Sequence, residues 1–114
     1  MKAALGAIAV AVALAGGSAR GAEKIYAGSE AAALRCANIV ALTGVALNGA
    51  GRLGALEKEV MLGISFLMLE EHVSGTWAQK KAALEVVRDR RGVVETLEDF
   101  ENLAEQCLRD FPIN

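Results

Sequence analysis

The stretch VETLEDFENLAEQCLRDF, residues 94–111, has the most regular pattern in the chain. Its apolar residues recur every three or four positions, which is the spacing of one face of an α-helix. They are Leu97, Phe100, Ala104, Cys107, Leu108 and Phe111. Acidic side chains occupy the positions between them, and Pro112 follows, where a helix cannot continue. We therefore predict a helix over about 94–111 whose apolar face carries Cys107.

A helix with a similar apolar stripe is predicted near the start of the chain. It should begin after Ser29, because serine caps helix N-termini well and Glu30 would then lie in the first turn. The stripe consists mostly of small side chains: Ala33, Cys36, Ala37, Val40, Gly44 and Leu47. The run Asn48-Gly49-Ala50-Gly51 should end this helix, since Asn and Gly tolerate the left-handed conformation of a C-terminal turn.

The chain has two cysteines, Cys36 and Cys107, and each lies on a predicted core-facing stripe. They belong to no metal-binding or redox motif. We therefore predict a disulfide that joins the first and last helices, with two buried thiols or an intermolecular link as the alternatives.

A second helix is predicted from about Leu53 to Val73, and its centre, residues 60–69, is apolar nearly all round. A helix without a polar face is usually buried on several sides, so we expect it to be the central helix of the bundle. The alternative is that a partner or a second subunit covers one side. The apolar run is too short to cross a bilayer.

A third helix should start at Trp77, because Thr76 and Gln79 have the spacing of a capping box. It is largely charged and should lie at the surface. Gly92 is expected to end it, although this glycine could instead lie within a longer helix. The sequence thus predicts an all-α fold: a small four-helix bundle, or three long helices if the Gly92 break is not real.

Residues 1–22 have the pattern of a signal peptide, with Lys2 before an apolar stretch and small residues where cleavage would fall, between about 19 and 22. Residues 23–114 would then form one helical domain, periplasmic or secreted, with no stable membrane span. Removing residues 1–22 leaves 10 basic against 14 acidic residues, a net charge of −4. Such a domain offers no diffuse basic surface for nucleic acid.

We predict no catalytic, cofactor-binding or metal-binding residues. His72 is the only histidine and has no second ligand at helical spacing, so we expect a solvated helix end. Ser65 has no nucleophile motif around it. The basic segment from Lys80 to Arg91 could bind an anionic partner, but complementarity with the acidic last helix is the simpler interpretation.

The leading functional hypothesis is a non-enzymatic envelope protein that acts through protein contact, as a binding partner, inhibitor or chaperone, or through self-association by the apolar second helix. The first alternative is a carrier of a small apolar ligand, lined by Met61, Phe66, Met68 and Trp77. With its Cys36–Cys107 link, the expected architecture is similar to that of small acid-stress chaperones of the bacterial envelope. That similarity gives the second alternative, an acid-responsive switch.

Overall fold

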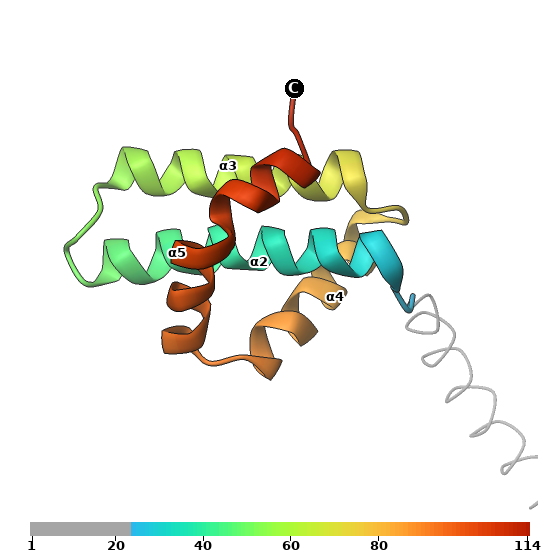
Figure 1. The fold of residues 1–114 in the computed structure, drawn as a ribbon, viewed down its shortest axis with the longest axis horizontal. Helices are drawn as coiled ribbons and strands as arrows, with labels where there is room; N and C mark the ends of the chain where they lie inside the picture. Colours follow the sequence, from blue (N-terminus) through green and yellow to red (C-terminus); the bar gives the residue numbers. More distant parts are fainter. Residues whose placement is uncertain (1–23) are drawn as a thin grey trace, which may run out of the picture.

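The computed structural model describes residues 24–114, which form four α-helices joined by short connections (Figure 1). In chain order they are α2 (Gly28–Gly49), α3 (Ala55–His72), α4 (Trp77–Arg90) and α5 (Val93–Asp110). The predicted all-α fold is confirmed. Gly92 separates α4 from α5, so this part of the chain contains four helices rather than three long ones. The predicted signal peptide, residues 1–22, lies outside the described residues.

Local sequence signals placed most helix ends within one or two residues. The Thr76 hydroxyl accepts a hydrogen bond from the Gln79 N–H (3.1 Å), and the Gln79 side chain accepts one from the Thr76 N–H (2.8 Å). This confirms the capping box at the start of α4. Gly51 adopts a φ of +73°, the left-handed conformation expected after α2.

The predicted cap of the first helix is wrong. The helix α2 begins at Gly28, one residue before Ser29, and no side chain caps it. The start of the helix and the residues before it are instead fixed by contacts with the connection between α3 and α4. The Glu30 carboxylate accepts a hydrogen bond from the Ser74 N–H (2.7 Å), and the Tyr26 hydroxyl donates to the Ser74 carbonyl (2.7 Å). These contacts are distant in sequence, so a local capping rule could not anticipate them.

The predicted position of α3 at the centre of the bundle is also wrong, because α2 is the central helix. It packs against α3, α4 and α5, while the other three make few contacts with one another (Figure 1). Its residues are buried on several sides: Ala33, Leu34, Cys36, Ala37, Asn38, Ile39, Val40, Thr43 and Gly44. Only Ser65, Met68 and Leu69 are buried on α3. The small side chains of α2 allow three neighbours to approach it, which the apolar content of α3 alone cannot achieve.

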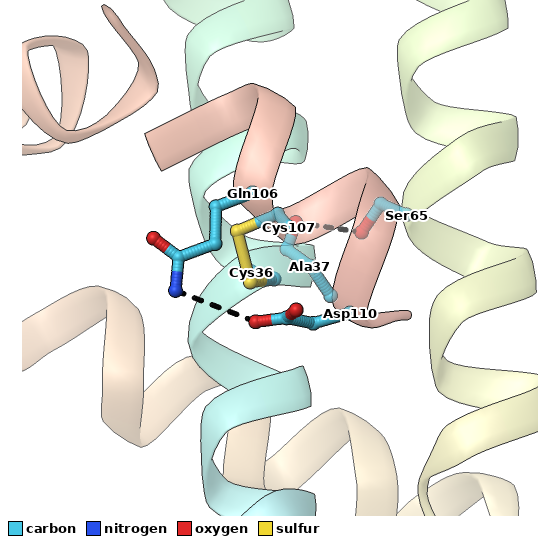
Figure 2. Close-up of a disulfide and its surroundings, with 6 residues drawn as sticks. All are labelled: Cys36, Ala37, Ser65, Gln106, Cys107 and Asp110. Atoms are coloured by element: carbon cyan, nitrogen blue, oxygen red, sulfur yellow. Dashed lines mark hydrogen bonds between the residues drawn. A yellow bond between two sulfur atoms is a disulfide. The ribbon is translucent and has the colours of Figure 1, made fainter. Parts of the chain in front are cut away.

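Small residues set the close contact between α2 and α3. A Cβ atom at Gly44 would lie 3.1 Å from the Cβ of Met61, so no larger residue fits there without a shift. Nearby, the buried Ser65 hydroxyl donates to the Ala37 carbonyl across the two helices (2.8 Å; Figure 2). The polar residue in the apolar run of α3 is therefore used for helix packing.

The disulfide predicted between Cys36 and Cys107 is present and joins α2 to α5, with the two Cα atoms 5.6 Å apart (Figure 2). Beyond α5, the tail returns to the end of α3. There the His72 ring lies 2.7 Å from the Pro112 carbonyl through Nε2 and meets the Phe111 ring edge-on, with 5.4 Å between centroids. His72 thus secures the C-terminal tail, rather than standing as a merely solvated helix end.

By length and composition, α2 is the helix among the described residues that could cross a membrane. Half of its most apolar window is covered by the other helices. That burial is what the core helix of a compact domain requires, and it accounts for the apolar composition.

Candidate interaction surface

The outward side of α3 carries an apolar stripe that the other described helices leave largely uncovered. Its four positions follow the alternating four- and three-residue spacing of a coiled-coil seam: Leu56, Val60, Gly63 and Leu67. Leu56 is 74 % exposed and Val60 is 55 % exposed, whereas Leu67 is half-buried. Gly63 is exposed too, and a Cβ built there would meet nothing within 4 Å. We call these four residues the α3 seam.

A glycine within such a seam allows another helix backbone to approach closely, because no side chain holds it away. Beside the seam, Phe66 packs against Trp77 with their ring centroids 5.0 Å apart. Both rings are close to half exposed, at 44 % and 48 %. Large aromatic side chains at the edge of an apolar stripe are typical of protein interfaces.

The charges beside the α3 seam are all of one sign. Glu57, Glu59, Glu70 and Glu71 are exposed and lie next to seam positions on the helix. In coiled coils, the side chains that flank the seam select the partner. Two copies of α3 packed along this seam would oppose glutamate with glutamate, which disfavours self-association. A helix flanked by lysine or arginine would be complementary.

The structure does not bring together the four residues predicted to line a space for an apolar ligand. Met68 is fully buried in the core, and Met61 packs against Gly44 of α2. Phe66 and Trp77 contact each other at the surface. None of these residues lines the two grooves that α2 forms with α4 and the α4–α5 turn.

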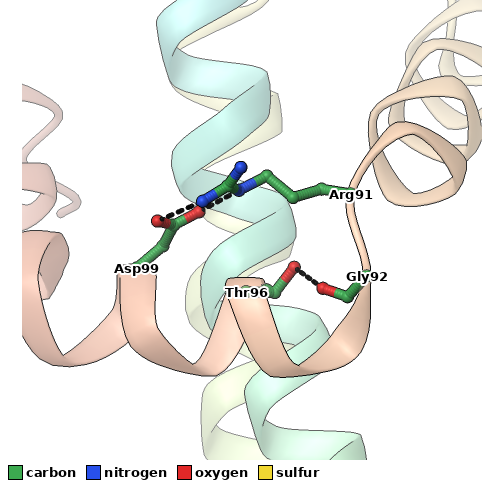
Figure 3. Close-up of polar contacts among 4 residues, drawn as sticks. All are labelled: Arg91, Gly92, Thr96 and Asp99. Atoms are coloured by element: carbon green, nitrogen blue, oxygen red, sulfur yellow. Dashed lines mark hydrogen bonds and ion pairs between the residues drawn. The ribbon is translucent and has the colours of Figure 1, made fainter.

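The predicted complementarity between the basic third helix and the acidic last helix is seen in one ion pair among the described residues. Arg91, just after α4, forms a bidentate ion pair with Asp99 of α5, with N–O distances of 2.6 and 3.0 Å (Figure 3). In the same turn, the Thr96 hydroxyl donates to the Gly92 carbonyl (2.8 Å). The pair fixes the turn between the two helices, while Arg90 on α4 makes no ion pair among the described residues.

Two carboxyl groups have lowered pKa values. Hydrogen bonds from Arg91 lower the pKa of Asp99, and hydrogen bonds from Ser74 lower the pKa of Glu30. In both cases the folded state favours the ionised form. These groups therefore stabilise the fold above the pKa range of ordinary carboxyl groups, and this contribution disappears as the pH falls through their folded-state values.

We predict that acidification weakens the domain through these two contacts. The melting temperature should fall between pH 7 and about pH 3, since Glu30 and Asp99 must take up protons that the unfolded chain binds more readily. The double variant Glu30→Gln/Asp99→Asn should show a shallower decline than the wild type in melts followed by circular dichroism. Parallel curves for the two proteins would contradict the assignment.

The described residues define a small all-helical domain with a disulfide between its first and last helices. Within them, His, Cys, Asp and Glu side chains form no group of three that could hold a metal ion. Comparison of the chain with protein-family models, curated proteins and solved structures finds no match. Its function is therefore inferred from its own side chains.

Proposed function

We propose that this protein is a non-enzymatic binding protein that holds an amphipathic helix of a partner along the α3 seam. The observation that carries the proposal is the coiled-coil-spaced stripe Leu56, Val60, Gly63 and Leu67. The first three of these residues are exposed, and Leu67 is half-buried. A row of apolar side chains exposed to water is unfavourable, and a partner that covers the row removes this cost. The partner helix would lay its own apolar side chains along this row.

The charges beside the seam select the kind of partner. Because the flanking residues are glutamates, the partner helix should carry lysine or arginine on both sides of its apolar stripe. Such surface attractions are screened by salt, so binding should weaken as ionic strength rises. The same glutamates make the protein a monomer under this proposal.

Export belongs to the same proposal. The apolar stretch after Lys2 followed by small residues supports secretion, and the Cys36–Cys107 disulfide suits the oxidising periplasm or cell exterior. In that compartment the protein would meet partners that are themselves exported.

Calorimetric titration with two synthetic helical peptides tests the proposal. The peptides share one apolar seam, which is flanked by lysines in one and by glutamates in the other. We expect the lysine-flanked peptide to bind at least about tenfold more tightly. Val60→Glu should weaken its binding by about tenfold or more, because it buries a charge at the contact. Val94→Glu on α5, where valine is 67 % exposed, is the matched control and should leave binding unchanged.

Equal weakening by Val60→Glu and Val94→Glu, or the absence of binding to the lysine-flanked peptide, would refute the proposal. Light scattering on the purified domain supplies the second readout, with a monomer expected. A stable dimer that Val60→Glu dissociates would assign the seam to a second copy of the chain and overturn the basic partner.

A further inference from the structure

A groove of about 460 Å³ lies between the first half of α2 and the turn that joins α4 to α5. Its volume falls within the range of small-molecule sites, about 300–1,000 Å³. Apolar side chains form part of its wall, among them Ile39 and Val87. The remaining wall is polar and includes three arginines, Arg35, Arg90 and Arg91.

The charges in this groove do not cancel. Arg91 is held by Asp99, the one carboxylate that lines the groove. Arg35 and Arg90 make no ion pair among the described residues, although Arg35 is near enough to Asp99 to lower its pKa. The lining thus carries three guanidinium groups against one carboxylate, while Glu95 and Glu98 act on Arg91 from outside the lining. Arg35 and Arg90 are the positive charges left for a ligand. Guanidinium groups bind carboxylates and phosphates through paired N–H donors.

Asn38 supplies an independent sign of a ligand. It lies at the middle of α2 and is only 5 % exposed, yet its side chain makes no hydrogen bond with the described residues. A buried amide is normally paired, because leaving it unpaired costs about 1–3 kcal/mol. Among the described residues, the Thr43 hydroxyl oxygen is the side-chain polar atom that is both inaccessible to solvent and unpaired. The Asn38 amide is unpaired but is not such an atom, so a solvent-sized opening still reaches it. That opening is the groove, which Asn38 lines.

A second groove, of about 270 Å³, begins at the same residue. Asn38 lines both, and the second one continues along α2 and α4 between Leu42, Val45 and Leu84. Its wall is largely apolar, with Glu85 and Arg88 at the edge. The arginine-lined groove and the apolar groove therefore join at the unpaired side-chain amide of Asn38.

We propose that these grooves bind a small amphiphilic anion, an alkyl carboxylate of the fatty-acid class. Arg35 and Arg90 hold the carboxylate, and the Asn38 amide donates a further hydrogen bond to it. The alkyl chain lies along the second groove against Leu42, Val45 and Leu84. This site is separate from the α3 seam, so either proposal can fail without the other.

Titration of the isotopically labelled protein with decanoate, followed by nuclear magnetic resonance, tests this inference. We expect saturable binding that shifts the side-chain amide signal of Asn38. Arg35→Gln and Arg90→Gln should each weaken binding by about tenfold, the loss expected from one charge-assisted contact. Arg52→Gln, which replaces an exposed arginine of the α2–α3 connection, is the matched control and should bind like the wild type.

Two further probes separate the parts of the ligand. Decanol lacks the charge and inorganic phosphate lacks the chain, so both should bind at least about tenfold more weakly than decanoate. Decanol binding as tightly as decanoate would overturn the role of the arginines. Phosphate binding as tightly would overturn the amphiphilic ligand, and decanoate binding that leaves the Asn38 amide signal unmoved would overturn the site.

Discussion

Reduction of the Cys36–Cys107 disulfide is expected to lower the free energy of unfolding by about 4 kcal/mol. The bridge joins residues 71 positions apart, so it removes many conformations from the unfolded chain. It also fastens α5 to the central helix, which α5 contacts more than any other part of the bundle. For a domain of this size, such a loss corresponds to a melting temperature roughly 15–30 °C lower.

Denaturant unfolding with and without a thiol reductant measures this loss. The variant Cys36→Ala/Cys107→Ala is the control, and it should match the reduced wild type and be insensitive to the reductant. A change below about 1 kcal/mol on reduction would show that the link adds little to the stability of the folded domain.

Met68→Ala is expected to cost about 2–5 kcal/mol, the range for truncating a large apolar side chain in a packed core. Met68 is fully buried in the core cluster that α3 shares with α2 and α5, so its removal leaves a cavity there. Leu56→Ala on the same helix should change stability by no more than about 0.5 kcal/mol, because Leu56 is 74 % exposed.

Chemical denaturation of the two variants measures both effects with one method. Equal losses for Met68→Ala and Leu56→Ala would contradict the division of α3 into a core side and a free side. A large loss of stability for Met68→Ala alone would show that the outward side of α3 contributes little to the fold and is free to bind a partner.

Features of the fold that depend on neighbouring residues could be predicted from the sequence. The Thr76–Gln79 capping box, the break at Gly92 and the periodicity of α5 each involve positions a few residues apart. The disulfide followed from placing Cys36 and Cys107 on two apolar stripes. The first three signals lie within a few residues of one another, and the disulfide needed only that each cysteine lie on the apolar face of its own helix.

The identity of the central helix could not be predicted in this way. The apolar run of α3 indicated burial on several sides, yet that helix keeps Val60 and Phe66 exposed. Burial depends on how many neighbours can reach a helix, and small residues such as Ala37 and Gly44 decide this on α2. The largely exposed seam supports the alternative prediction for α3, in which a partner covers one side of this helix.

The groove lined by Arg35, Arg90 and Arg91 could not be predicted from sequence patterns either. Arg35 and Arg90 are 55 positions apart, and no periodicity relates them. A polar residue within a helix, such as Asn38, is ordinarily expected on the solvent side. Its burial without a hydrogen-bond partner becomes visible only when α4 and α5 are placed against α2. The basic residues between Lys80 and Arg91 were the one signal in the sequence that pointed toward this region.

Fluorescence of Trp77 tests most directly whether the α3 seam binds a basic amphipathic helix. Trp77 is the only tryptophan in the chain, packs on Phe66 beside the seam and is 48 % exposed. Adding the lysine-flanked peptide should shift its emission to shorter wavelength in a saturable way, because the partner excludes water from the ring. Val60→Glu should move the shift to at least about tenfold higher peptide concentration, and Val94→Glu should leave the titration unchanged. A wild-type spectrum that stays unchanged throughout the titration would contradict the account.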